Sequence, residues 1–199
     1  MILASTASLF VIATWIVGGS VYATGGVVAD TACIVMNPAD FATRRSPLDS
    51  VTIALGGGVA KVCYGRPSAR GRKMIGSDHV PFGSIWRTGA NEPAMIHTTI
   101  ALDVGNIHIG PGTYSLYTVP GEKEWEVIVN RSTSQWGAER NYTDAVRAQE
   151  VGRTRVSSVH TEHYVETFTI RAKSEPGGNA TMVLEWENTR VEVPLSVTN

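Results

Sequence analysis

Apolar and polar residues alternate along most of the chain after residue 45, in short runs separated by turn residues. In the stretch ETFTIRAK, Phe168 and Ile170 fall on one side of an extended chain, and the polar residues between them fall on the other. Met182, Leu184 and Trp186 share one side of the stretch TMVLEWE in the same way. This alternation indicates β-strands with one buried and one wet face.

Nine such runs are predicted as strands, and they cover 50–55, 59–65, 94–103, 106–110, 112–120, 125–130, 164–173, 180–188 and 189–197. The stretches PGEKE (120–124) and EPGGN (175–179) are predicted to be hairpin turns. Only 143–151 has a helical pattern, with Thr143 as its N-cap. The sequence therefore predicts an all-β domain over 46–199, of a β-sandwich or jelly-roll-like type.

The first 29 residues contain no charged side chain and are mostly apolar. The run 2–23 would form a helix of about 33 Å, which matches a bilayer core of roughly 30 Å. A cleaved signal peptide is the alternative, since the VYA of 21–23 and the VVA of 27–29 resemble cleavage sites. The run is long for a signal peptide and has no basic residue before it. We therefore predict a retained transmembrane helix over 1–24.

This helix carries small residues that would let a partner helix approach closely, namely Ser5, Ser8, Gly18 and Gly19. The export-like start favours an N-terminus in the cytoplasm and a domain in the periplasm, so the expected location is a bacterial inner membrane. Residues 25–45 are predicted to be a linker, with a short helical turn around 38–41.

Two cysteines, Cys33 in the linker and Cys63 in a predicted strand, are candidates for a disulfide in an oxidising compartment. A bridge between them would tie the domain to its stalk. The alternative of two unpaired thiols, one of them buried, stays open from the sequence alone.

The charge of the chain excludes one class of partner. Its 199 residues are 43% hydrophobic and 18% charged, with a formal net charge of −1. No basic surface for nucleic acid is expected from that balance. No catalytic triad, nucleotide-binding loop or zinc motif is visible, and the five histidines (79, 97, 108, 160, 163) lack metal-ligand spacing. No metal and no cofactor are therefore predicted.

Two loop-like stretches concentrate the polar chemistry, YGRPSARGRK (64–73) and GSIWRTGANEP (83–93). Guanidinium groups and backbone N–H groups in such loops can bind a carboxylate, a phosphate or a lipid headgroup. The structural alternative is that Arg87 and Glu92 pair and brace a turn at 88–90. The candidate contact residues are Tyr64, Arg66, Arg72, Trp86, Arg87, Asn91 and Glu92.

The aromatic residues of the strand-like runs have two interpretations. We interpret Trp125, Trp136, Trp186, Tyr114 and Tyr117 as core side chains. An exposed aromatic platform for carbohydrate is the alternative.

Four blocks of sequence together resemble one bacterial family, the domain of unknown function 2911. They are VCYGRPSARGRKMIGSDHVPFGSIWRTGANEP, GPGTYSLYTVPGEKEWEVIVN, SQWG and VLEWENTRVEVPL, and the resemblance runs from Ser46 to Leu195. It implies an exported β-domain, usually behind a signal peptide, and it carries no activity. The apparent anchor of this chain departs from that pattern.

The retained helix favours a non-catalytic function: an accessory subunit that binds other subunits of a membrane complex and covers its periplasmic face. A photosynthetic reaction centre with its light-harvesting antenna is the complex we name first. One alternative is a periplasmic binding module for an anionic or carbohydrate ligand. An enzyme with Glu92 or a histidine as its acid–base group is another, and catalysis is not expected.

Overall fold

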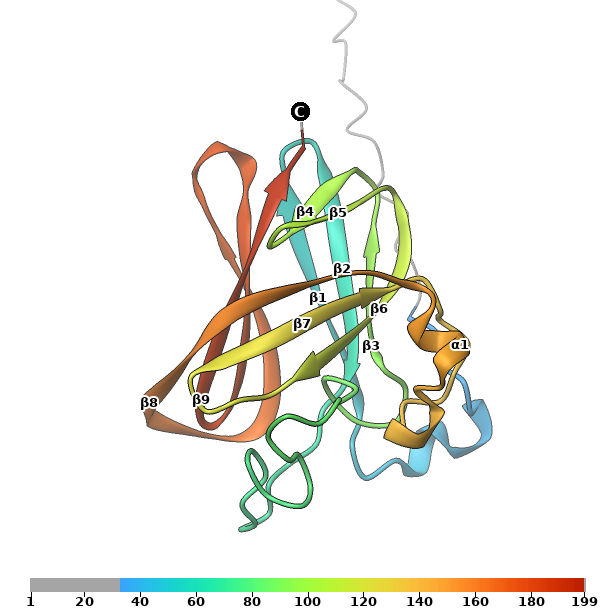
Figure 1. Cartoon of the computed structure of the whole chain (residues 1–199), viewed down its shortest axis with the longest axis vertical. Helices are drawn as coiled ribbons and strands as arrows, with labels where there is room; N and C mark the ends of the chain where they lie inside the picture. The colour runs from blue at the N-terminus through green and yellow to red at the C-terminus, as the bar shows by residue number, and fades with distance from the viewer. Residues whose placement is uncertain (1–32, 199) are drawn as a thin grey trace, which may run out of the picture.

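The structure, a computed structural model, describes residues 33–198 and is all-β within that range (Figure 1). Its strands are β1 (Leu48–Leu55), β2 (Gly58–Gly65), β3 (Ala94–Thr98), β4 (Leu102–Val104), β5 (Ile107–Ile109), β6 (Gly112–Val119), β7 (Glu124–Asn130), β8 (Glu150–Ser174) and β9 (Ala180–Val197). Short helical pieces are η1 (Pro38–Thr43), η2 (Glu139–Asn141), α1 (Asp144–Arg147) and η3 (Pro176–Gly178).

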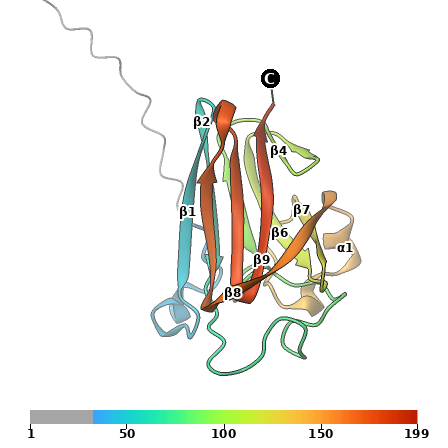
Figure 2. The same ribbon diagram turned by 90° about the vertical axis from the view of Figure 1, so that its left-hand side faces the viewer.

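All nine strands belong to one antiparallel sheet, in the order β1-β2-β3-β6-β7-β8-β9-β4-β5. The long strand β8 pairs with β7 through its first part, 150–157, and with β9 through its second part, 158–174. The sheet curls, so that β1 comes into contact with β8 and β9 (Figures 1 and 2). The main apolar core fills the inside of the curl, and a smaller cluster of Tyr117, Ile128, Tyr142 and Val146 is separate from it.

Aromatic side chains from distant segments meet at the centre of this core. Trp86 stacks on Trp186 with 5.8 Å between ring centroids, and its edge contacts Trp125 and Phe168 at 6.0 and 5.0 Å. All four rings are buried. Offset-stacked and edge-to-face pairs of this kind add stability beyond their buried area, which holds the loop that carries Trp86 against the sheet.

The alternation pattern correctly predicted the buried faces of the last strands. Phe168 and Ile170 are buried in β8, and Met182, Leu184 and Trp186 are buried in β9. Both predicted hairpin turns join antiparallel neighbours, and the Thr143 hydroxyl caps α1 by accepting from the Val146 N–H.

Four details of the predicted elements were wrong. Strand β8 begins at Glu150, well before the predicted start at residue 164. Its first part was missed because that run is mostly polar and lacks the apolar alternation that marks a strand. The helix predicted over 143–151 is only Asp144–Arg147, and the strands predicted over 180–188 and 189–197 are the single strand β9. The strand predicted over 94–103 is instead two elements, the whole of β3 and the start of β4.

The predicted membrane helix over 1–24, with Ser5, Ser8, Gly18 and Gly19, lies outside the described residues. Between residues 33 and 198, no helix is both long and apolar enough to cross a bilayer.

Candidate functional site

The loop between β2 and β3 carries most of the predicted site residues and crosses one end of the curled sheet. Trp86 fixes it there, since its backbone N–H donates to the Thr118 carbonyl at 2.7 Å and its carbonyl accepts from the Thr118 N–H at 2.9 Å. Its indole lies in the aromatic core. The backbone from which the polar residues after Trp86 extend is therefore held in place.

Two non-glycine residues that follow Trp86 in this loop have a left-handed backbone. Thr88 has φ 54° and Asn91 has φ 66°, a region that is uncommon for any residue other than glycine and costly for a β-branched one. Hydrogen bonds hold both in place: the Thr88 hydroxyl donates to the Thr118 hydroxyl at 3.2 Å, and the Asn91 amide donates to the Ser46 carbonyl at 3.0 Å. Such strain persists only where the surroundings enforce it.

Two glycines let other segments close around the loop. A Cβ on Gly65 would overlap the Ala90 carbonyl oxygen, and a Cβ on Gly137 would lie 2.5 Å from the Asn91 carbonyl oxygen and 2.8 Å from the Arg87 Cδ. Gly65 belongs to the YGRP block and Gly137 to the SQWG block. These sequence blocks therefore meet at the WRTGANE loop.

Gly137→Ala is expected to lower the free energy of unfolding by about 1–3 kcal/mol, because the added methyl meets backbone atoms that are held on both sides. Chemical denaturation measures the change. Gly110→Ala is the matched control, since nothing lies within 4 Å of its added Cβ, and it should change stability by less than about 0.5 kcal/mol. Equal effects of the two variants would contradict this account of the loop.

Glu92 does not pair with Arg87, which corrects the predicted brace. Its carboxylate accepts from both terminal nitrogens of Arg44, at 2.7 and 2.8 Å, and from the Met36 backbone N–H at 2.7 Å. The two charged side chains are 4% and 5% exposed, so this is a buried pair. Glu92 is buried and accepts three hydrogen bonds, two of them from a permanent cation, which argues against its role as an acid–base group.

Two opposing effects act on the pKa of Glu92. Burial raises it, while the hydrogen bonds from Arg44 and Met36 lower it, and the net result is a pKa below the usual carboxyl value. Glu92 is therefore ionised across the neutral range and serves as a structural anion.

Arg87 instead pairs with Glu139, through hydrogen bonds that are longer than those of Arg44. Its Nη2 atom lies 3.3 and 3.4 Å from the two Glu139 oxygens, its Nη1 lies 3.5 Å from the Asn91 carbonyl, and its buried Nε has no partner among the described residues. Arg44 makes short bidentate bonds, whereas Arg87 keeps unused donor capacity.

A pocket of about 270 Å³, which we call the Arg87 pocket, opens beside this guanidinium. Its polar lining is Arg87, Asn91, His79 and Glu139, and its apolar lining includes Met74, Val80, Trp86 and Trp186. Arg87 and Asn91 can donate hydrogen bonds to a ligand, and Glu139 can accept them. The lining contains no hydroxyl or thiol side chain, so it offers no nucleophile of that kind.

Of the remaining predicted contact residues, Tyr64 and Arg66 bond to β8 across the curled sheet, and Arg72 bonds within its own loop. The Tyr64 hydroxyl accepts from the Ile170 N–H at 2.9 Å, and burial raises its pKa. Arg66 donates to the Phe168 carbonyl at 3.3 Å and pairs with Asp49 at 3.2 Å. Arg72 donates to the carbonyls of Ala69 and Ser68. Only Trp86, Arg87 and Asn91 of the predicted set meet in one pocket.

The aromatic residues of the strands divide by exposure. Trp125, Trp186 and Tyr117 are buried, as the core interpretation predicted, while Tyr114 and Trp136 are half-buried. A platform for carbohydrate needs open rings, and the three buried ones cannot supply it.

The described part of the predicted linker, 33–45, is fastened to the domain. Cys33 and Cys63 form a disulfide, and Arg44 pairs with Glu92. The Arg45 carbonyl accepts from Arg70 at 2.8 Å. The segment, which we call the strap, therefore braces the WRTGANE loop from outside.

The histidines do not converge. His97 hydrogen-bonds Thr113 at 2.9 Å, and His108 hydrogen-bonds Asp103 at 2.9 Å. No cluster of three or more metal-ligating side chains occurs from residue 33 to residue 198.

Sequence reasoning missed Arg44, Glu139 and Trp186 as members of this region. Arg44 and Glu139 lie 48 and 52 residues from their partners, and their local sequence carries no signal for either contact. Trp186 was assigned to the core, and its place beside Trp86 follows from the pairing of β8 with β9.

The fold and the site define an all-β domain with a small polar pocket at one end of its sheet. The chain matches the family described as "Protein of unknown function (DUF2911)" over residues 46–195, and it belongs to that family. This confirms the family indicated by the four sequence blocks. No curated protein and no solved structure matches the chain.

Proposed function

We propose that the domain is a non-catalytic binding module that holds a small anionic ligand at Arg87. The observation that carries the proposal is the contrast between the two arginines of the loop region. Arg44 is saturated by Glu92, whereas Arg87 has long bonds to Glu139 and an unpartnered Nε. A carboxylate or phosphate would make the short bidentate bonds that Glu139 does not.

The surroundings of Arg87 support selective binding. Its side chain is 22% exposed, so a bond to it is less screened by water than one at the open surface. Glu139 is 48% exposed and can turn away into solvent when a ligand anion takes its place. The strap and the aromatic core hold the loop rigid, which reduces the ordering that binding would need.

Titration calorimetry with inorganic phosphate and with succinate tests this function. Arg87→Met is expected to weaken binding about 10- to 100-fold, because it removes charge-assisted hydrogen bonds. Glu139→Gln is expected to strengthen binding, because it removes the competing carboxylate. Added salt should weaken binding in the unmodified protein.

Arg155→Met is the matched control, since Arg155 also pairs with a glutamate at 3.4 Å but lies 71% exposed and outside the pocket. It should leave binding unchanged. If neither anion binds, or if Arg155→Met weakens binding as much as Arg87→Met does, the proposal fails.

The location and the finer fold class belong to the same proposal. The Cys33–Cys63 disulfide supports a periplasmic domain, since disulfides persist in oxidising compartments. The curl of the sheet around its main core supports assignment to the β-sandwich or jelly-roll-like class.

The accessory-subunit function rests on the apolar residues 1–24 and stays a prediction, including its photosynthetic form. Intact mass of the protein from solubilised membranes, with identification of co-purifying chains, tests it. A mass that includes Met1 in a stoichiometric complex would support it, and a mass beginning near Thr24 or Asp30 without a partner would exclude it.

A further inference from the structure

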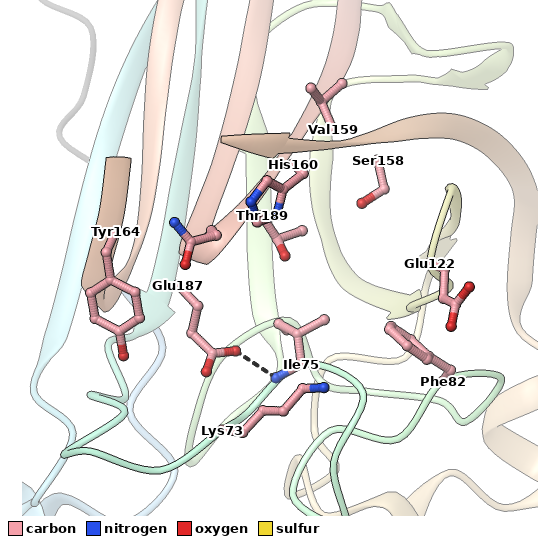
Figure 3. Close-up of a pocket in the computed structure, with 11 residues that line it drawn as sticks. Lys73, Ile75, Phe82, Glu122, Ser158, Val159, His160, Tyr164, Glu187 and Thr189 are labelled. Carbon is pink, nitrogen blue, oxygen red and sulfur yellow. Dashed lines mark hydrogen bonds between the residues drawn. The ribbon is translucent and has the colours of Figure 1, made fainter. Parts of the chain in front are cut away.

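A second and larger pocket, of about 480 Å³, lies where the β8–β9 pair meets the loop after β2 and the β6–β7 turn (Figure 3). We call it the β8–β9 pocket. The segment 73–82 contributes to both pockets: Met74 and Val80 line the Arg87 pocket, and Lys73, Ile75 and Phe82 line this one. None of the residues discussed as ligand contacts so far lines it.

Exposed apolar side chains gather at this pocket. Five large hydrophobic residues are exposed in the described chain, and three of them, Phe82, Val159 and Tyr164, line the pocket with 40%, 55% and 44% exposure. Figure 3 shows the rings of Phe82 and Tyr164 on opposite sides, with Ile75 between them. Apolar groups collected in one place on a surface mark a binding site more often than single ones do.

Polar side chains with unused hydrogen-bonding capacity stand around these apolar groups. They come from the facing strands β8 and β9, from the β6–β7 turn and from the loop. In the described chain none of them makes a side-chain hydrogen bond or an ion pair. These residues are Lys73, Glu122, Ser158, His160 and Thr189.

The walls of the pocket are held in place before any ligand arrives. The Glu187 carboxylate accepts from the backbone N–H groups of Met74 and Ile75 at 2.9 and 2.8 Å, which fixes the loop to β9 (Figure 3). The pairing of β8 with β9 shifts register between His160 and Val165, so the strand bends there and carries Tyr164 outward.

The charges and polar groups of the lining disfavour two classes of ligand, anions and wholly apolar molecules. The lining has one cationic side chain, Lys73, and two carboxylates, Glu122 and Glu187, so the site has no excess of positive charge for an anion. The Glu187 oxygens are already engaged by two backbone N–H groups. A wholly apolar ligand would leave the polar side chains without water or partners. A neutral ligand with several hydroxyls and apolar C–H faces satisfies both the rings and the polar groups.

We propose that the β8–β9 pocket binds a neutral saccharide of one or two sugar units, seated between Phe82 and Tyr164. The volume falls within the range of small-molecule sites. This site is independent of the anion site at Arg87, and each can fail without the other.

Saturation-transfer NMR and titration with cellobiose, maltose and N,N′-diacetylchitobiose, up to about 10 mM, test the proposal. At least one of these sugars is expected to bind, and Phe82→Ala and Tyr164→Ala are each expected to weaken that binding about tenfold, because each removes a stacking surface. Arg87→Met should leave sugar binding unchanged.

Phe41→Ala is the matched control, since Phe41 is 45% exposed and lies outside the pocket. It should not affect binding. Circular dichroism of every variant separates loss of binding from loss of the fold. The proposal is overturned if none of the three sugars binds, or if binding survives both aromatic substitutions in folded protein.

Discussion

Glu92→Gln is expected to lower the free energy of unfolding by about 3–5 kcal/mol at neutral pH, because it leaves the Arg44 guanidinium buried without its counter-ion. An arginine cannot shed its proton to relieve this cost. The strap would then lose its main hold on the WRTGANE loop. Urea denaturation of the unmodified protein and of Glu92→Gln measures the difference in their free energies of unfolding.

The partner substitution should behave differently. Arg44→Met leaves a buried carboxylate that keeps its bond from the Met36 N–H and can take up a proton. Its cost should therefore begin to shrink while the pH is still above the unfolded carboxyl pKa of about 4.3, whereas that of Glu92→Gln should shrink only below this value, as the unmodified protein loses the stability that its ionised Glu92 provides. The double variant Arg44→Met with Glu92→Gln should cost less than the sum of the two single changes, since neither group then remains as an unpaired charge.

The pH dependence of the unmodified protein follows from the lowered pKa of Glu92. A carboxyl whose pKa is lower in the folded than in the unfolded protein stabilises the fold. That stability is fully present above the unfolded-state pKa of about 4.3, and it is lost as the pH falls through the folded-state pKa. Protonation of Glu92 in acid should therefore weaken its bonds to Arg44 and so the attachment of the strap to the domain.

Glu124→Gln is the matched control for this pair. Glu124 pairs with Arg155 at 3.4 Å, but both side chains are more than half exposed. Its loss should cost less than about 1 kcal/mol. If Glu92→Gln costs no more than Glu124→Gln, the buried pair is not the brace that its geometry indicates.

Loss of the Cys33–Cys63 disulfide is expected to lower stability by about 3–4 kcal/mol, because the bond closes a loop between residues 30 positions apart and removes that freedom from the unfolded chain. The double variant Cys33→Ser with Cys63→Ser avoids a free thiol. Denaturation with and without a reducing agent gives the value. The reducing agent should destabilise the unmodified protein and leave the serine variant unchanged.

The strap gives this prediction a second, local consequence. Without the disulfide, its start is no longer fastened to β2, and the Arg44–Glu92 pair becomes its main attachment. Amide hydrogen exchange should then rise over 33–43 while the core strands keep their protection. Unchanged exchange in the strap after reduction would show that the pair alone holds it.

The strands were predictable where apolar side chains recur at every second residue, although the first half of β9, from Ala180 to Trp186, is buried on both faces. Phe168 and Ile170 in β8, and Met182, Leu184 and Trp186 in β9, follow the period of two that an extended chain imposes. The first half of β8 was not predictable in this way. Its residues are mostly polar, and it is a strand because β7 offers backbone partners.

The site was predictable as a place and not as a set of contacts. The sequence singled out the WRTGANE loop through its mix of aromatic, charged and turn residues, and the loop does line a pocket. It also suggested that Arg87 and Glu92 pair and brace the turn at 88–90, because an Arg, an Asn and a Glu in one short stretch can form a polar network. The actual partners, Glu139 and Arg44, come from distant segments.

The sequence by itself determined the all-β class, most strands, the two hairpin turns and the family, because these depend on local periodicity, turn residues and contiguous blocks. The tertiary structure alone decided the disulfide, the choice of partner for each arginine and the gathering of Phe82, Val159 and Tyr164 around one pocket. Pairings of this kind depend on which segments the curled sheet brings together, and that is set by the sum of many long-range contacts.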